Sequence, residues 1–223
     1  TLLRDHCIGH PGELTIAELF GFWATLVMGD IAQARERGSY LLREADDRRD
    51  LYANVGLRVG LPHLIWLAQD NPERGRRESG EAMQLWSHRG FLVQHVFDLL
   101  APAQMDIYEG EGQGAHRRVT TDWPFLSASL HMRVRVVRTV MWSLRGRCAL
   151  SAALERPREA RHLAGLARQD ARRLRKERTR YATGLADVLE AGIAAVEGRP
   201  AQAAALLCAA EIAFDAQDMR LHA

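Results

Sequence analysis

The stretch that decides the fold is Gly29-Asp30-Ile31-Ala32-Gln33-Ala34, because it returns in closely similar form as Gly198-Arg199-Pro200-Ala201-Gln202-Ala203. Three weaker copies lie between these two. With Ala34 as the anchor, the steps between copies are 41, 40, 45 and 43 residues, and the matching positions are Gly75, Ala115, Ala160 and Ala203. Periods of this length are typical of helical repeat proteins. The sequence therefore predicts a stack of similar helical units.

Each copy carries the signals of a helix pair. Apolar residues such as Leu26-Val27 lie eight and seven positions before the anchor and close a first helix. The turn then carries Gly29, Gly110 or Gly198 in three copies, and in three copies a proline follows two residues after the turn position. Glycine accepts the left-handed conformation that ends a helix, and proline fits the first turn of the next one. A second helix is therefore predicted after each turn.

The predicted second helices carry small or apolar residues four and seven positions after the anchor, as in Ala34, Gly38 and Leu41. This spacing places the three on one helix face, where small side chains allow a second helix to approach closely. The third copy departs from the pattern at Asp122, and Pro124 follows. A short or kinked helix is expected there.

These signals predict an all-α fold, a right-handed α-α superhelix of about five helix hairpins. One domain is expected over residues 1–223, as a fragment of a larger protein, with repeats at 12–47, 50–89, 91–127, 130–177 and 179–217. First helices are expected near 14–28, 50–69, 91–109, 130–154 and 181–197. Second helices are expected near 31–46, 72–88, 114–123, 157–177 and 200–216. A further helix is expected from Asp215 to His222.

Two other features refine this map. Pro62 and Pro102 fall inside predicted first helices, where each removes a backbone donor and clashes with the preceding turn, so kinks are expected. Almost no segment alternates apolar and polar residues with a period of two, so no sheet is expected.

The turn and the small residues resemble the second half of a tetratricopeptide repeat. Gly29, Ile31, Ala34, Gly38 and Leu41 fit this pattern, as does the copy that starts at Gly198. The period exceeds the 34 residues of that family, and the first-helix aromatic positions are not regularly filled. The resemblance implies a tetratricopeptide-like solenoid with longer helices.

A wider resemblance covers most of the chain. The order of Asp50-Leu51-Tyr52-Ala53, Trp66-Leu67-Ala68, Gly90-Phe91 and Trp123-Pro124 is similar to the carboxy-terminal repeat region of large bacterial signalling proteins. In those proteins the region follows a eukaryotic-like serine/threonine kinase domain and often a predicted ATPase module. The resemblance implies a regulatory or docking segment that binds a protein or peptide partner, including another domain of the same polypeptide.

Composition narrows the class of protein. The chain is 47% hydrophobic and 26% charged with a net charge of +2, which agrees with a soluble domain and gives no strong bias toward nucleic acid or membrane. No apolar run approaches the roughly 18 residues that a bilayer requires. Three dispersed cysteines, Cys7, Cys148 and Cys208, form no disulfide framework and favour a reducing cytoplasm. We expect Cys148 and Cys208 to be small core residues.

A search for catalytic and metal-binding patterns predicts neither activity nor cofactor. His6, Cys7 and His10 lie close together but lack the further ligands that zinc requires. The glycine-rich residues 109–114 lack the lysine of a phosphate loop, so a turn is expected. His95 and Asp98 lie three apart on a predicted helix, where a structural hydrogen bond is the default. The chain is therefore predicted to be non-enzymatic.

Two charged surfaces remain as candidates. Nine basic residues lie between Arg158 and Arg180, which favours either phosphate binding or, as the simpler alternative, a solvated outer face. A polar strip on three predicted first helices is the second candidate. It comprises Asn54, Arg58, Gln94, His95, Asp98, His131, Arg135, Arg138, Trp142 and Arg145.

The polar strip has two interpretations. It lines a concave groove that binds an acidic or extended peptide, or its arginines pair with acids of adjacent helices and hold the stack together. For the domain as a whole, the favoured function is a scaffold for protein interaction. The alternatives are a small-molecule sensor, which a deep closed pocket would favour over an open channel, and a nucleic-acid-binding array.

Overall fold

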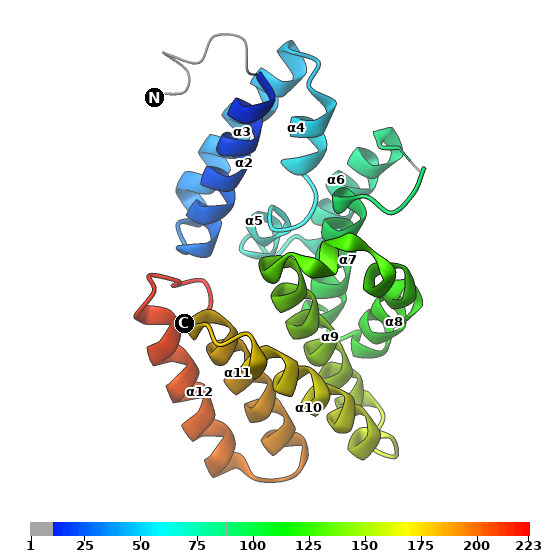
Figure 1. The fold of residues 1–223 in the computed structure, drawn as a ribbon, viewed down its shortest axis with the longest axis vertical. Helices are drawn as coiled ribbons and strands as arrows, with labels where there is room; N and C mark the ends of the chain where they lie inside the picture. Colours follow the sequence, from blue (N-terminus) through cyan, green and yellow to red (C-terminus); the bar gives the residue numbers. More distant parts are fainter. Residues whose placement is uncertain (1–10, 88) are drawn as a thin grey trace.

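The computed structural model describes residues 11–87 and 89–223, and these residues form helices and turns with no β-strand. The prediction of an all-α chain is confirmed for this part (Figure 1). The helices are α2 (Pro11–Val27), α3 (Ile31–Asp47), α4 (Leu51–Gly56), α5 (His63–Leu67), α6 (Pro72–Leu85), α7 (Val93–Tyr108), α8 (Gly112–Ala128), α9 (Arg135–Glu155), α10 (Ala160–Lys176), α11 (Arg180–Val196) and α12 (Pro200–Asp215), with a 3-10 turn η1 (Leu130–Arg133) before α9.

Side-chain caps explain where several helices begin. Asp30, Asp50, Asn71 and Thr179 each accept a hydrogen bond from the backbone N–H three residues later, at 3.0 to 3.2 Å. Such caps satisfy amide groups that have no partner inside the helix. The start of α3, α4, α6 and α11 is thus marked by a capping residue in the local sequence.

The turns before the second helices have the predicted left-handed conformation. Gly29, Gly110 and Gly198 have φ values of 82°, 82° and 74°, and Asp70 takes the same place in the second copy with φ 52°. Each lies immediately after the hydrogen-bonded end of a helix, so the chain reverses and the next helix packs back on the preceding one. The left-handed turn is confirmed in these four copies, whereas in the turn before α10 Arg156 has φ −125°.

The small anchor residues lie at helix contacts. Ala34 and Ala115 are fully buried, and a Cβ atom at Gly75 would lie 2.6 Å from the Met105 Cε atom. Larger side chains at these positions would separate the helices, because interiors are close-packed. The regular spacing of small residues therefore reflects close helix approach.

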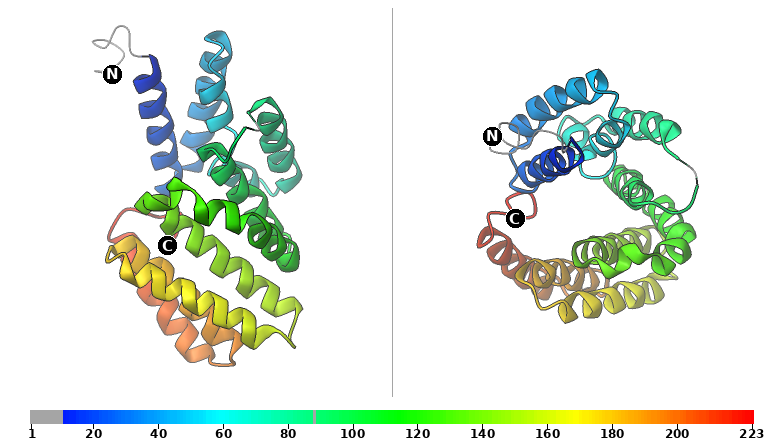
Figure 2. Two further views of the ribbon diagram at one scale, coloured as in Figure 1. Left: turned by 45° about the vertical axis from the view of Figure 1, so that its right-hand side comes forward. Right: turned by 45° about the horizontal axis from the view of Figure 1, so that its top comes forward.

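The helices follow one another as hairpins, and the first helices of neighbouring hairpins also pack together. α9 contacts its own partner α10, the preceding α8 and the first helices α7 and α11 on either side. The right-hand view of Figure 2 shows the helices arranged around a central opening, with the two ends of the array close together. Apolar clusters line the contacts from α2 to α12 in succession.

The predicted helix over residues 50–69 is wrong as a single element. α4 ends at Gly56, turns follow, and Pro62 occupies the position before α5. Gly60 has φ 77° and lies against the Phe97 side chain, so the break is fixed by a contact with α7. Proline and glycine together end the helix where a kink alone was expected.

Other helix ends also differ from expectation. α8 continues through Pro124 to Ala128, so the short helix expected at 114–123 is wrong in length. Pro102 lies inside α7 without ending it. Cys148 is buried as expected, whereas Cys208 is exposed on α12.

The helix expected from Asp215 to His222 does not form. The chain leaves α12 at Asp215, turns at Asp218 with φ 55° and runs back across the array. The Leu221 backbone N–H donates to the Val27 carbonyl oxygen at 3.3 Å. The tail, residues 216–223, thereby joins the last hairpin to the first.

None of the helices described is both long and apolar enough to cross a membrane.

Candidate functional site

A cavity of about 530 Å³ lies inside the ring of helices. Its walls come from α2, α5, α7, α9, α11, α12, the turn before α5 and the tail. The lining residues are Val27, Leu61, Leu64, Leu100, Gln104, Val136, Val140, Ser143, Arg147, Tyr181, Leu185, Val188, Phe214, Met219, Leu221 and His222. Most are apolar, a few are polar, and the volume is in the range of small-molecule sites.

One face of α9 supplies the floor of this cavity. Val136, Val140, Ser143 and Arg147 are spaced by four, three and four residues, which places them in one row along a helix. Val136 is 57% exposed, so the cavity meets solvent at this end of the row. Arg147 lies at the other end, deep in the protein.

Arg147 carries the only formal charge among the described lining residues at neutral pH, and none of them is acidic. It forms no hydrogen bond or ion pair with any described residue, and its Nε atom is buried without a partner. The side chain keeps some accessible surface because it lines the cavity. Burial lowers the pKa of the Arg147 guanidinium. Arginine is rarely buried unless an anion is paired with it.

The tail places an aromatic group beside this charge. The His222 ring lies edge-on to Tyr181 at 5.5 Å between ring centroids and is tilted against Phe214 at 5.2 Å. The Tyr181 Oη and His222 Nε2 atoms are 3.5 Å apart, and His222 Nδ1 has no partner among the described residues. Burial and the charge of Arg147 lower the pKa of His222 to about 4, and burial raises the pKa of Tyr181 to about 12. Both groups are therefore neutral at pH 7.

His63 of α5 adds a second neutral imidazole near the cavity. It is fully buried, and its Nδ1–H donates to the Gly60 carbonyl oxygen at 2.5 Å. Burial lowers the pKa of His63 to about 4, with a further contribution from Arg147, while the hydrogen bond to Gly60 and the nearby Gln104 side chain oppose the shift. The described residues that line the cavity thus include one cation and no anion.

None of the ten predicted groove residues lines this cavity. Arg138 donates from Nε and one terminal nitrogen to Glu177 at 2.7 Å each, and Arg135 lies 3.6 Å from the same carboxylate. Arg145 forms a bidentate pair with buried Asp170. These contacts join α9 to α10. For these three arginines, the contacts agree with the second interpretation of the strip, in which arginines pair with acids of adjacent helices.

The other predicted strip residues also contact neighbouring elements. Asn54 donates to Asp46 at 2.6 Å, Arg58 lies 3.9 Å from Glu78, and His131 Nε2 lies 3.2 Å from the Phe91 carbonyl oxygen. Gln94 is buried, and Trp142 packs against the apolar cluster of α11. Peptide binding by this strip stays a prediction.

His95 and Asp98 do not hydrogen-bond each other. Asp98 accepts from the Ser79 hydroxyl at 2.9 Å, and His95 Nδ1 accepts from the Leu92 backbone N–H at 3.0 Å. Both side chains line a smaller hollow of about 240 Å³ between α7 and α8, together with Arg118 and Asp122. Burial raises the pKa of Asp98, and Ser79 and His95 oppose the shift. Unlike the central cavity, this hollow is lined by a basic side chain, Arg118, and by two carboxyl groups, those of Asp98 and Asp122.

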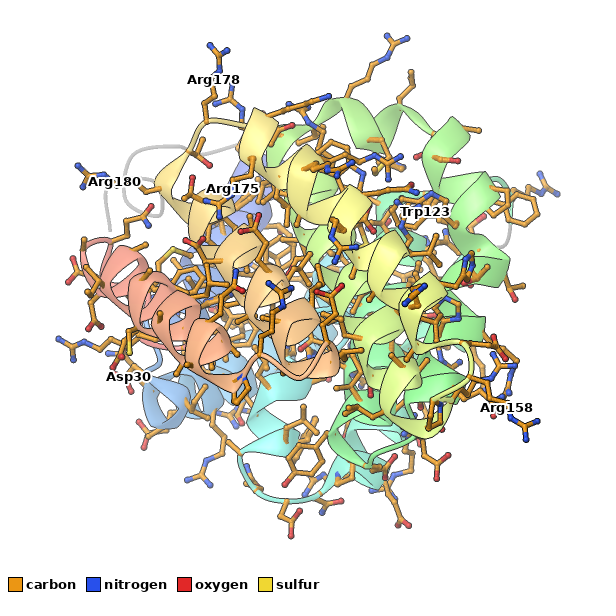
Figure 3. The ribbon with its side chains drawn as sticks, turned by 90° about the horizontal axis from the view of Figure 1, so that it is seen from below. Asp30, Trp123, Arg158, Arg175, Arg178 and Arg180 are labelled. Atoms are coloured by element: carbon orange, nitrogen blue, oxygen red, sulfur yellow. The ribbon has the colours of Figure 1, made fainter. Side chains whose placement is uncertain are left out.

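The basic run on α10 is largely paired or solvated. Arg175 contacts Asp187 and Glu190, and Arg168 contacts Glu197. Figure 3 shows Arg158, Arg178 and Arg180 extending outward in separate directions. This dispersal agrees with a solvated outer face for these three residues.

No group of three or more potential metal ligands occurs among the residues that the structure describes. The candidate set of His6, Cys7 and His10 lies outside them. The glycine-rich residues 109–114 form the turn at Gly110 and the first turn of α8, as expected.

Arg147, Tyr181 and His222 were not among the predicted site residues. A signal for Arg147 was present, because the apolar row Val136, Val140 continues through Ser143 to Arg147 at helical spacing. No comparable local signal marks His222, whose position depends on the returning tail.

Comparisons of the chain with models of protein families, with curated proteins and with solved structures found no match. Function is therefore argued from the geometry of the cavity.

Proposed function

We propose that this chain is a non-catalytic sensor domain that binds a small apolar molecule in its central cavity. The observation that carries the proposal is the cavity of about 530 Å³, whose walls come from both ends of the array and from the helices between them. A ligand held there contacts elements that are otherwise distant in the chain. Its binding energy can thus stabilise one arrangement of the whole ring.

We further propose that the array is a tetratricopeptide-like superhelix belonging to a larger bacterial signalling protein. Support comes from the spacing of Gly29, Ala34, Gly38 and Leu41 and from the resemblance to repeat regions that follow serine/threonine kinase or ATPase modules. In such a protein, ligand binding would set the activity of the attached module. The domain itself needs no catalytic residues for this role.

The test of ligand binding uses the neutral dye Nile red, whose fluorescence rises in apolar surroundings. We expect saturable binding to the full chain and at least a tenfold loss in Val140→Trp, because the larger ring takes up part of the space that the dye occupies. Leu154→Trp on the exposed surface of α9 is the matched control and should bind dye like the wild type. Equal dye binding by both variants would contradict the proposal.

A second candidate function, protein interaction, is favoured by the outer face of α12. Ile212 is 70% exposed there, on the side of the helix opposite the buried Ala203, Ala210 and Phe214. A terminal repeat of a solenoid leaves such a face available to a following repeat. Sedimentation of the wild type and of Ile212→Lys would test this role, because an association through this face should weaken in the variant.

A further inference from the structure

The cavity contains an uncompensated positive charge in an otherwise apolar enclosure. Arg147 has no acidic residue beside it among the described lining residues, and the two buried histidines near it, His63 and His222, are neutral at pH 7. A buried unpaired cation is costly, and an anion that enters the cavity removes this cost. Among ligands with an apolar body, the charge therefore favours those that also carry a negative group.

We propose that the ligand is an amphipathic monocarboxylate, whose carboxylate binds the Arg147 guanidinium and whose apolar body lies along Val140, Leu100 and Leu185. This inference rests on the ligand-binding function proposed above. It adds the chemical class of the ligand and the residue that recognises it.

A carboxylate fits better than a phosphate monoester. The cavity offers one cation, which balances one negative charge, and no second arginine or lysine lines it. The planar guanidinium presents parallel N–H groups that match the two oxygens of a carboxylate. Neutral polar groups complete the site, since Ser143, Gln104 and the Tyr181 hydroxyl can donate hydrogen bonds to the same oxygens.

The position of the charge also sets the orientation of the ligand. Arg147 lies at the deep end of the α9 row and Val136 lies at the end that meets solvent. The carboxylate therefore enters first, and the apolar body fills the path to the opening. Ligands with a bulky group next to the carboxylate should be excluded.

The test is displacement of Nile red from the full chain at pH 7 by decanoic acid, decanol and decylamine, which share one apolar body. We expect the acid to displace the dye at a concentration at least tenfold lower than the alcohol, because a charge-assisted hydrogen bond contributes about that factor. The amine should displace the dye least. Decyl phosphate, if it bound more tightly than the acid, would overturn the choice of carboxylate.

Variants of Arg147 separate recognition from stability. Arg147→Met should keep Nile red binding and lose the preference for acid over alcohol. Arg147→Lys should keep part of that preference, because its charge remains. Arg172→Met, on the exposed face of α10, is the control and should keep the full preference. If Arg147→Met unfolds, the acid-to-alcohol ratio of the wild type and of Arg147→Lys still tests the proposal.

The two proposals fail in different ways. Absence of Nile red binding in the wild type would remove the ligand-binding function itself. Dye binding with equal displacement by acid and alcohol would leave that function in place and overturn only the carboxylate assignment.

Discussion

Two arginines of α9, Arg145 and Arg147, lie two positions apart and have opposite surroundings. A step of two residues rotates a side chain by about 200° around the helix axis, so the two face opposite sides. Arg145 pairs with buried Asp170 and lies over the Trp123 ring at 3.6 Å, whereas Arg147 has no partner among the described residues and lines the cavity. One arginine joins neighbouring helices, and the other gives the cavity its charge.

Removal of Asp170 should be costly, because it leaves Arg145 partly buried and without its counter-ion. We expect Asp170→Ala to lower the free energy of unfolding by about 3 kcal/mol or more. Urea denaturation measures this change. Glu190→Ala, which removes a more exposed partner of Arg175, should cost less than about 1 kcal/mol. Equal losses in the two variants would contradict the assigned role of Asp170.

The buried histidines predict a loss of stability in mild acid. The pKa of His63 is about 4 in the folded protein and about 6.5 when unfolded, so the unfolded state binds more protons between these values. The free energy of unfolding should therefore fall as the pH drops from 6.5 to 4, by up to about 1.4 kcal/mol per pH unit for each such histidine. His222 contributes in the same direction.

Denaturation at a series of pH values measures this slope. His63→Asn should reduce it, since one of the two titrating groups is gone. A variant with the wild-type slope would show that His63 titrates alike in the folded and unfolded states.

At the scale of elements, local signals located most of the second helices. α3, α6 and α12 begin at the predicted residues 31, 72 and 200, because caps, prolines and left-handed turns act within a few residues. Among the first helices, the one predicted over residues 50–69 is wrong as a single element. The break between α4 and α5 depends on the packing of Gly60 against Phe97, a contact across 37 positions that no local pattern encodes.

Glycines on α8 and α10 test the close approach of helices. A Cβ atom at Gly112 would overlap the Ser151 backbone carbon, whereas one at Gly165 has no neighbour within 4 Å. We expect Gly112→Ala to destabilise the protein by about 1 to 3 kcal/mol through overpacking. Gly165→Ala should stabilise it by up to about 1 kcal/mol, since alanine favours the helix. Thermal unfolding of both variants gives the comparison, and stabilisation by Gly112→Ala would contradict the α8 to α9 contact.

At the scale of the molecule, the ring could not be predicted from the repeat. A periodic sequence specifies how each hairpin meets the next, but the closure depends on Leu221 meeting Val27, almost 200 residues away. The same limit applies to the site. The row on α9 that ends at Arg147 is visible in the sequence. Tyr181 and Phe214 reach the same cavity through the packing of α11 and α12, and His222 reaches it because the tail returns.

The tail should control access to the cavity. Leu221→Asp places a charge at the junction with α2, so we expect residues 216–223 to exchange amide hydrogens faster and Nile red to dissociate faster. Ala216→Ser, an exposed position at the other end of the tail, is the control and should leave both rates unchanged. Hydrogen exchange detected by mass spectrometry measures the first effect. Wild-type exchange in Leu221→Asp would show that the tail is held elsewhere.

Because Leu221 contacts Val27, the distance between the tail and α2 depends on the curvature of the whole array. In an open row of hairpins, the angle at each junction can change independently. In a closed ring, a change in the angle at one junction must be compensated at the others. A molecule that widens the space between α9 and α11 must therefore either bend the other junctions or separate the tail from α2. The distance between these two segments then reports whether the interior is filled, and a pair of fluorescent labels across the seam would read it directly.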